Sequence, residues 1–251
     1  MDDFSEICDF TAKHKASKLD ENLVKYLGEY NLSFKKTIER DRNIGLLKDS
    51  TTKFVITGQQ AGLFLGPLLT IYKIISCIEI AKEIQKRTKT SVVPLFWLQS
   101  EDHDIEEIDQ VVLPYNPKEL INLGISNESR NSANDVLLSN NIANVFDKVE
   151  QKFKEEGISI DRLEQLKSYY RQDKSYADAF ANTLAELFAE DGLLIFNPRH
   201  PTVSKLLQNK FLFAFENAKS ISDILKSQTG IEEQVAIRDK SPLFFFRLDK
   251  T

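Results

Sequence analysis

The sequence contains few of the residues that mark several protein classes. It has only two cysteines, Cys8 and Cys77, in 251 residues, so we expect neither a disulfide framework nor a cysteine-based zinc site. Its 33 Lys and Arg residues are outnumbered by 38 Asp and Glu residues, and the net charge is −5. Broad nucleic-acid surfaces need clustered positive charge. The composition therefore predicts a protein of the reducing cytoplasm that does not bind nucleic acid.

Long apolar runs are also missing. The longest, residues 63–84, is interrupted by Lys73, Glu79, Lys82 and Glu83. Charges at the depth of a bilayer are costly, so this run predicts a buried helix. The first six residues are acidic and have no apolar centre, which argues against a signal peptide. We therefore expect no membrane partner.

Glycine is scarce, and its placement is informative. Three of the nine glycines, Gly58, Gly62 and Gly66, fall in one ten-residue stretch. This stretch follows a β-like run at residues 53–57 and precedes a helix predicted over residues 67–87. Strand, glycine-rich turn and helix is an order that can present backbone N–H groups to an anionic ligand. The stretch therefore predicts a site for a nucleotide-like or phosphate-bearing ligand.

The glycine spacing does not specify that ligand. It matches neither the Walker A motif nor Gly-x-Gly-x-x-Gly, so a tight turn with close backbone packing is an equal alternative. Gln59 and Gln60 add amide donors and acceptors that could bind a ligand. Pro67 suits the first turn of a helix. One apolar helical face is expected to be buried, comprising Leu68, Ile71, Ile75 and Ile78, with Ile74 and Cys77 widening it.

Two further runs predict buried strands, at residues 91–98 and 193–196. Near-continuous apolar runs are typical of parallel strands that are covered on both faces. With the helix between them, the first two strands form a βαβ unit, so the fold class is α/β with a parallel sheet. Helical patterns recur at residues 145–154, 160–170, 175–190 and 202–227, and a strand pair is expected at 233–237 and 243–248. Residues 115–145, rich in Asn and Ser, predict an irregular insertion.

An acidic cluster follows the second strand. Residues 100–107 hold five carboxylates and His103, one of the three histidines. Asp102 or Asp104 could bind a metal together with His103, although neighbouring side chains diverge on a regular element. An acidic helix start is the alternative. The position at the end of a buried strand favours a general base or a hydrogen-bond partner for an amine or a ribose.

Arg199 lies just after the third strand, where a guanidinium group could bind a phosphate or a carboxylate. A simple turn before the next helix is the alternative. Lys73, one turn into the first long helix, could likewise reach a phosphate or remain solvated.

Two stretches closely resemble the signature of the BshC family, to which the cysteine-ligase step of bacillithiol biosynthesis is assigned. They are VITGQQAGLFLGPLLTIYK at residues 55–73 and VPLFWLQSEDHDIEE at residues 93–107. Residues 192–198, 230–235 and 243–246 look like later family blocks. The resemblance implies a Rossmann-like parallel sheet core, akin to nucleotidyltransferases, with an inserted connecting segment.

The resemblance also implies a function. The family adds L-cysteine to the amine of glucosaminyl-malate, which makes it a ligase that forms a C–N bond in the last step of the pathway. Activation of cysteine by a nucleotide, ATP, is expected, and no metal is assigned. The motif match carries over two sets of residues. The catalytic set is Glu101, Asp102, His103 and Asp104. The binding set is Gly58, Gln59, Gln60, Gly62, Gly66, Pro67 and Thr70, to which we add Arg199.

Family members are about twice this length and dimerise through a C-terminal coiled coil that is absent here. We therefore expect a truncated chain that lacks the C-terminal part of the family fold. The expected parts are an N-terminal helical segment (1–48), the first half of the core (49–114), the inserted segment (115–173) and a truncated second part (174–251). Two alternatives stay open: a non-catalytic or split-gene fragment that still binds ligands or partners, and a nucleotidyltransferase-like enzyme with another acceptor.

Overall fold

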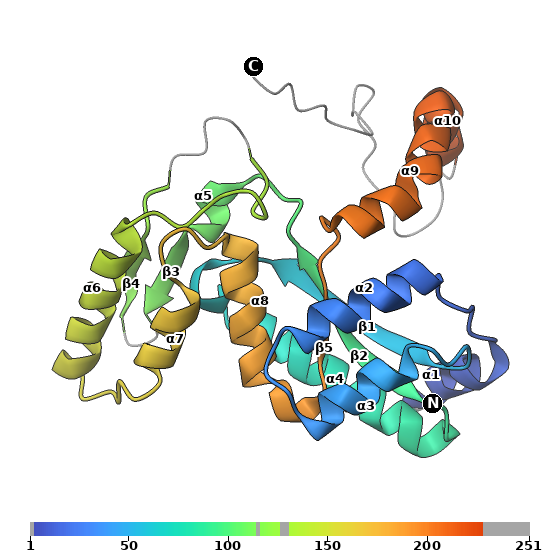
Figure 1. The fold of residues 1–251 in the computed structure, drawn as a ribbon, viewed down its shortest axis with the longest axis horizontal. Coiled ribbons are helices and arrows are strands. Elements are labelled where there is room, and N and C mark those ends of the chain that lie inside the picture. The colour runs from blue at the N-terminus through green and yellow to red at the C-terminus, as the bar shows by residue number, and fades with distance from the viewer. Residues whose placement is uncertain (1–2, 114–115, 126–130, 228–251) are drawn as a thin grey trace. The chain divides into compact units, whose positions relative to one another are not determined.

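The computed structural model describes residues 3–113, 116–125 and 131–227 (Figure 1). The chain divides into two compact units, residues 1–200 and residues 201–251. The first unit holds a parallel sheet with helices on both faces, and the second holds two helices in its described part. Within the described residues, no helix combines the length and apolarity needed to span a bilayer.

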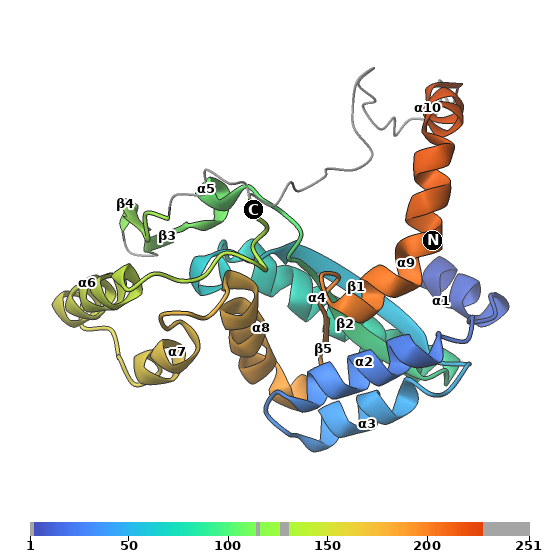
Figure 2. The same cartoon turned by 45° about the horizontal axis from the view of Figure 1, so that its top comes forward.

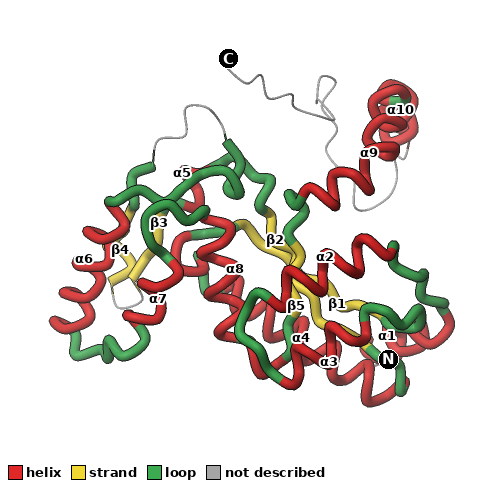
Figure 3. The backbone as a smooth tube through the Cα atoms, viewed as in Figure 1, coloured by secondary structure: helices red, strands yellow, loops and turns green. Residues whose placement is uncertain are grey.

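A three-stranded parallel sheet forms the centre of the first unit, as predicted (Figure 3). Its strands are β1 (Lys53–Gln60), β2 (Val92–Gln99) and β5 (Leu194–Phe196), in the order β1-β2-β5. Helix α4 (Leu69–Thr88) connects β1 to β2, which confirms the predicted βαβ unit. Seven consecutive residues of β2, Val92 to Leu98, are buried or apolar, which explains its place between the other two strands.

Strand β1 is longer than the sequence predicts. Gly58, Gln59 and Gln60 were expected in the glycine-rich turn, but they pair with Trp97, Leu98 and Gln99 of β2. Gln59 and Gln60 are polar, so the sequence gives no strand signal there. An edge strand can nevertheless carry polar side chains, because it is less buried than the central strand beside it. The turn is therefore shorter and runs from Ala61 to Pro67, around a 3-10 helix at Leu63–Leu65.

The buried face of α4 also differs from the predicted one. Leu68 and Ile75 are 63% and 44% exposed, whereas Ile74, Cys77 and Ile78 are buried. Thr70, Ala81 and Ile84 complete the buried face. Apolar residues occur all round the first half of this helix, so their spacing alone does not select the side that packs on the sheet.

Helices cover both faces of the sheet, and adjacent strand residues show which helix covers which face. Phe96 of β2 packs against Phe180 of α8 (Tyr176–Leu187), and Cys77 of α4 lies on the same face beside Val55. Phe196 of β5 packs against Tyr26 of α2 (Glu21–Leu32), on the opposite face. Because side chains alternate along a strand, α4 and α8 share one face and α2 covers the other.

The N-terminal segment is helical, as expected, but more buried than a surface segment. It contains α1 (Asp3–Lys13), α2 and α3 (Ile38–Leu46). Asp20 and Thr37 cap α2 and α3 with side chains that accept backbone N–H bonds. Asn31 of α2 bonds Ile195 through both its amide atoms, at 2.9 and 2.8 Å, which fixes α2 on β5.

The insertion is more regular than the sequence predicts. An antiparallel pair joins β3 (Gln110–Leu113), which precedes the region expected to be irregular, to β4 (Asn116–Asn122), which lies within it (Figure 2). Alternating burial over Leu120–Leu123 is the period-two signal, hidden by the surrounding Asn and Ser. Helix α5 (Ile105–Ile108) precedes β3, and helices α6 (Asn141–Glu155) and α7 (Leu163–Tyr169) lie in the insertion.

The helix predicted over residues 175–190 is present as α8, which Ser175 caps, and the following 3-10 helix η2 (Ala189–Asp191) ends at Gly192. The long helix expected in the second unit is divided into α9 (Pro201–Glu216) and α10 (Ala218–Ser227). Asn217 lies between them and donates its side-chain amide to the carbonyl of Phe213, a local bond that competes with regular helix. The strand pair expected at 233–237 and 243–248 lies outside the described residues.

Candidate functional site

The two sequence motifs meet at the carboxyl ends of β1 and β2. Gln60 is the last residue of β1 and pairs in register with Gln99 of β2, just before the acidic cluster. The Gln60 Nε2 atom donates to Asp102 Oδ2 at 2.5 Å and to Glu107 Oε2 at 3.2 Å. The glycine-rich stretch and the acidic cluster, which each follow a predicted strand, therefore share one edge of the sheet.

Asp102 is the best-anchored carboxylate of this cluster. The backbone N–H of Asp104 donates to its Oδ1 atom at 3.1 Å, and Gln60 donates to its other oxygen. Burial raises the pKa of Asp102, but the bonds from Gln60, Asp104 and His103 outweigh burial and leave the pKa below its usual value. Asp102 is consequently an anion at neutral pH, suited to hold a positive or hydrogen-bonding group.

The other predicted catalytic residues surround Asp102 less tightly. Glu101, His103 and Asp104 are exposed in the loop that precedes α5. The backbone N–H of His103 bonds the Asp102 carboxylate, which keeps His103 beside it. Within the described ranges, no group of three His, Cys, Asp or Glu side chains could hold a metal ion. The cluster therefore combines one fixed carboxylate with accessible acid–base groups.

Backbone packing accounts for the three glycines of the turn. A Cβ on Gly58 would lie 2.7 Å from the carbonyl oxygen of Trp97, and one on Gly62 would lie 2.9 Å from the Cα of Gly66. Gly66 has φ = +64°, in the region that favours glycine. The N–H groups of Gly62 and Gly66 donate to the carbonyls of Gln60 and Leu63. These two donors are therefore engaged within the turn.

The start of α4 holds an unusual polar group. Thr70 is fully buried, and its Oγ1 atom has no hydrogen-bond partner in the described part of the chain. Pro67 precedes the helix and accepts the N–H of Thr70. The N-cap residue, Leu68, makes no side-chain cap, so the first N–H groups of α4 receive no such bond. A buried hydroxyl without a partner is rare and points to an absent ligand or water.

Lys73 lies one turn further along α4. The sequence left open whether its amine reaches a phosphate or remains in solvent, and in the structure the amine is bonded within the protein. Its amine donates to the carbonyl of Gly58 at 2.7 Å and to Gln59 Oε1 at 3.0 Å. It thus holds the end of β1 and orients the Gln59 side chain. Cys77, further along, is buried, and burial raises the pKa of its thiol to about 11. This thiol stays protonated at neutral pH and is no nucleophile.

A second network, which sequence reasoning missed, joins the ends of β2 and β5. Ser100 Oγ donates to Asn197 Oδ1 at 2.6 Å, and Asn197 Nδ2 donates to Asn134 Oδ1 at 3.0 Å. The Asn134 and Ala133 N–H groups donate to the carbonyls of Ser100 and Asp102. This network fixes the loop that carries Asp102. A polar residue directly after each buried strand was the available signal.

Arg199 contacts the insertion rather than the acidic cluster. Its Nη2 atom lies 2.9 Å from Asp135 Oδ2, and its backbone N–H donates to Asn197 Oδ1 at 3.0 Å. Burial raises the pKa of Asp135. Hydrogen bonds from Asn134 and Ser132 and the charge of Arg199 lower it by more, so the pKa lies below its usual value. Arg199 is therefore already paired beside the strand ends.

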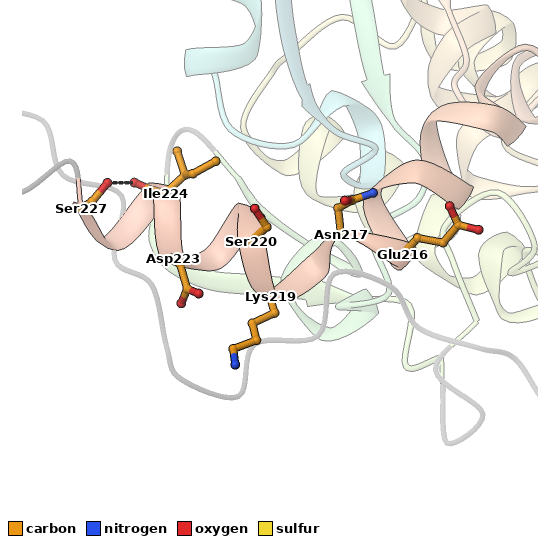
Figure 4. A pocket seen from close by; sticks show the side chains of 7 residues that line it. All are labelled: Glu216, Asn217, Lys219, Ser220, Asp223, Ile224 and Ser227. Carbon is orange, nitrogen blue, oxygen red and sulfur yellow. Dashed lines mark hydrogen bonds between the residues drawn. The ribbon is translucent and has the colours of Figure 1, made fainter.

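Two hollows lie elsewhere on the protein. One, of about 600 Å³, lies on the N-terminal helices, and its rim lysines Lys18 and Lys25 pair with Glu21 and Glu29. The other lies along α10, where Figure 4 shows side chains from successive helical turns pointing in different directions. The bond drawn there joins Ser227 Oγ to the carbonyl of Ile224, 2.7 Å away. Neither hollow gathers buried polar groups as the strand ends do.

Comparison with protein families matches residues 1–247 to the family described as bacillithiol biosynthesis BshC, N-terminal Rossmann-like domain. A protein of Geobacillus kaustophilus is 34% identical over 236 residues, covering 90% of this chain and 43% of the relative. Proteins of Anoxybacillus flavithermus and Bacillus cytotoxicus are 32% and 30% identical, covering 86% and 85% of this chain and 40% of each relative. All three carry the name "Putative cysteine ligase BshC". The chain spans about two fifths of the length of these relatives.

Proposed function

This chain belongs to the BshC family, and from that membership we propose that it supplies the substrate-binding strand ends of a cysteine ligase of bacillithiol biosynthesis. The proposed reaction joins L-cysteine to the amine of glucosaminyl-malate, the last step of the pathway, and forms an amide C–N bond. The observation that carries the proposal is the Gln60–Asp102–Glu107 arrangement at the carboxyl ends of β1 and β2.

The acidic cluster suits the amine substrate better than a phosphate. An ionised Asp102, fixed by Gln60, attracts the ammonium group of the substrate. After that group loses a proton, Asp102 orients the resulting amine. In the reaction, the amine nitrogen attacks the activated carboxyl carbon of cysteine, the C–N bond forms, and the leaving group departs with its bonding electrons. His103, exposed beside Asp102, is placed to accept the proton that the nitrogen loses.

The activating nucleotide fits a different part of the site. Five carboxylates in residues 100–107 would repel a triphosphate. The start of α4 offers uncapped N–H groups and the unpartnered Thr70 hydroxyl, which suit an anionic group. When bound, a nucleotide such as ATP would supply the activation of the cysteine carboxylate. Thr70 and the first turn of α4 would hold it, about one turn away from Lys73.

The test measures product formation from cysteine, glucosaminyl-malate and ATP, together with calorimetric binding of glucosaminyl-malate. Asp102→Asn removes a charge-assisted contact, so we expect about 10- to 100-fold weaker binding of this substrate and at least as large a fall in turnover. Gln60→Ala should weaken binding of glucosaminyl-malate about 10-fold, because it removes the bond that fixes Asp102 but leaves the carboxylate in place. His103→Ala should lower turnover and leave binding nearly unchanged.

Gln99→Ala is the matched control, because Gln99 is exposed at the neighbouring strand end and pairs in register with Gln60. Its binding and turnover should equal those of the unaltered chain. Undiminished binding and turnover in both Asp102→Asn and Gln60→Ala would contradict the assignment. Substrate binding that is weakened by Asp102→Asn, with no turnover, would instead indicate that the chain is the ligand-binding part of a longer or two-part enzyme.

A further inference from the structure

The turn between β1 and α4 has a backbone conformation that L-amino acids rarely adopt. Phe64, Leu65 and Gly66 all have positive φ, at +49°, +75° and +64°. Glycine accepts such values freely, but phenylalanine and leucine incur a steric cost at each residue. In the described ranges, Phe64 and Leu65 are the only adjacent pair of non-glycine residues with positive φ. Such strain persists only where the surrounding structure imposes the conformation.

The ring of Phe64 is anchored in the insertion. Its centroid lies 5.0 Å from that of Phe146 and 5.0 Å from that of Tyr170. Phe146 belongs to α6, and Tyr170 directly follows α7. Both of these side chains are buried, whereas Phe64 is half-buried. Aromatic pairs at these distances are favourable, so relaxing the backbone of the turn would require the ring to leave two partners.

Tyr170 also lies close to the backbone of the turn. Its hydroxyl is buried and has no hydrogen-bond partner in the part of the chain that the structure describes. Burial raises the pKa of Tyr170, and the nearby N–H groups of Leu65 and Phe64 oppose that rise. Leu65 is buried in the same apolar core as Tyr170. The insertion therefore contacts both the ring and the backbone of the strained turn.

The turn leads directly into the first residues of α4. A Cβ on Gly62 would lie 2.9 Å from the Cα of Gly66, so the two ends of the turn touch. Pro67 follows at once, and its carbonyl accepts the N–H of Thr70 at 2.9 Å. A shift of the turn would therefore move the Thr70 hydroxyl and the uncapped N–H groups at the start of α4.

We propose that Phe64 is a positioning residue. Its ring, held between Phe146 and Tyr170, keeps the turn in the left-handed conformation and so fixes the start of α4 for an anionic ligand. The inference rests on the proposed function, which places the nucleotide at that helix start. It adds a role for the insertion, which shapes the site through one side chain of the turn.

Phe64→Asn tests the role of the ring. Asparagine adopts positive φ more readily than phenylalanine, so this change keeps the backbone preference and removes the ring. We expect the amides of Leu65, Gly66 and Thr70 to exchange with solvent at least about 10-fold faster. ADP should bind at least about five-fold more weakly, because the binding conformation is less populated. Unchanged exchange, or unchanged affinity in a chain that binds ADP, would overturn the proposal.

Phe146→Ala removes the same contact from the side of the insertion. It should cause the same two changes, and Phe146→Leu, which keeps a large apolar side chain, should reverse most of both. The double variant Phe64→Asn/Phe146→Ala should bind ADP no more weakly than the weaker of the two single variants, because both remove one contact. Additive effects would show that the two side chains act separately and would overturn the proposal. Phe64→Asn alone decides the matter if Phe146→Ala unfolds the chain.

Phe34→Asn is the matched control. Phe34 is half-buried and packs edge-on against Tyr30 at a centroid distance of 5.0 Å, the distance at which Phe64 packs edge-on against Tyr170. Its loss should lower the urea midpoint and leave both the exchange of the turn amides and the affinity for ADP unchanged. If Phe34→Asn weakened ADP binding as much as Phe64→Asn, general stability would control binding and the proposal would be wrong.

Failure of the proposed function would look different. If the unaltered chain does not bind ADP, the nucleotide site at the start of α4 is contradicted, and the exchange of the turn amides in Phe64→Asn alone decides whether the ring holds the turn. If ADP binds and Phe64→Asn leaves its affinity unchanged, the nucleotide site stands and Phe64 has no positioning role.

Discussion

Two residues near the strand ends, Asp102 and Thr70, differ in how their polar atoms are hydrogen-bonded. Asp102 is held as an anion by donors on both of its oxygens, whereas the Thr70 hydroxyl is buried without a partner. An unmet buried hydroxyl is destabilising, and such groups persist where a ligand uses them. Under the proposed function, Asp102 faces the substrate amine and Thr70 faces an anionic group.

Thr70→Val tests the second role. Valine keeps the shape and removes the unpartnered hydroxyl, so we expect the free energy of unfolding to stay equal or rise by up to about 1 kcal/mol. The same change should weaken ADP binding at least about five-fold. Urea denaturation and calorimetry measure the two effects.

Thr183→Val is the control for that pair of measurements. The Thr183 hydroxyl donates to the carbonyl of Ala179 at 2.8 Å, so its loss should destabilise the chain by about 1 kcal/mol and leave ADP binding unchanged. A Thr70→Val variant that is clearly destabilised and binds ADP normally would show that the hydroxyl is structural.

At the scale of elements, α3 is joined to the end of α8 and to the start of β5 by side chains buried between them. Thr37 Oγ1 donates to the carbonyl of Ala189 at 2.7 Å, and the guanidinium of the buried Arg40 donates to the carbonyl of Ala185 at 2.5 Å. Asn43 Nδ2 donates to the carbonyl of Gly192 at 2.8 Å. These bonds position β5 and hence the Asn197 network at its end.

Gly192 is the tightest point of this junction. It has φ = +69°, and a Cβ there would lie 2.6 Å from Asn43 Nδ2 and 3.0 Å from the carbonyl oxygen of Glu39. Gly192→Ala should therefore cost about 2–4 kcal/mol, from the left-handed backbone and the displaced hydrogen bond. Chemical denaturation followed by circular dichroism measures the loss.

Gly157→Ala separates the two causes. Gly157 has φ = +67° but no atom within 4 Å of an added Cβ, so only the backbone cost of about 1 kcal/mol is expected. Equal losses in the two variants would show that close packing against α3 does not matter at Gly192.

For the molecule as a whole, several carboxylates are more acidic than usual in the folded state. Burial raises the pKa of Asp102, Asp135 and Glu186, but hydrogen bonds and nearby cations lower it by more. A carboxyl group with a lowered folded pKa contributes stability above its unfolded pKa of about 4 and loses it as the pH falls through the folded value. The chain should therefore be weakened by acid.

We expect the urea midpoint to fall steadily as the pH decreases from about 5.5 to about 3.5, the range in which these carboxyl groups take up protons. Glu186→Gln, which removes the partner of Lys35, should reduce this dependence, and Glu156→Gln, at an exposed position, should not. A chain that becomes more stable between pH 5 and pH 3 would refute the assignment of these shifts.

Sequence reasoning predicted the backbone plan well, because its signals are local. The three parallel strands, the βαβ connection and the helix over most of residues 175–190 are confirmed. Predictions were wrong where local signals compete. Gly58–Gln60 extend β1, a β-hairpin occupies part of the region expected to be irregular, and Asn217 divides the last helix. The part boundaries and the roles of the site residues stay predictions.

The sequence by itself determined that the two motifs would share an edge of the sheet. Parallel strands run in one direction, so residues that follow them must gather at the same end. Only the tertiary structure decided that Gln60 reaches Asp102, that Asn197 joins Ser100 to Asn134, and that Arg199 pairs with Asp135. Those contacts depend on strand register and on the path of the insertion, which involve residues distant in sequence. The exposed outer face of α4 was likewise decided by packing, since the helix is apolar on every side over its first turns.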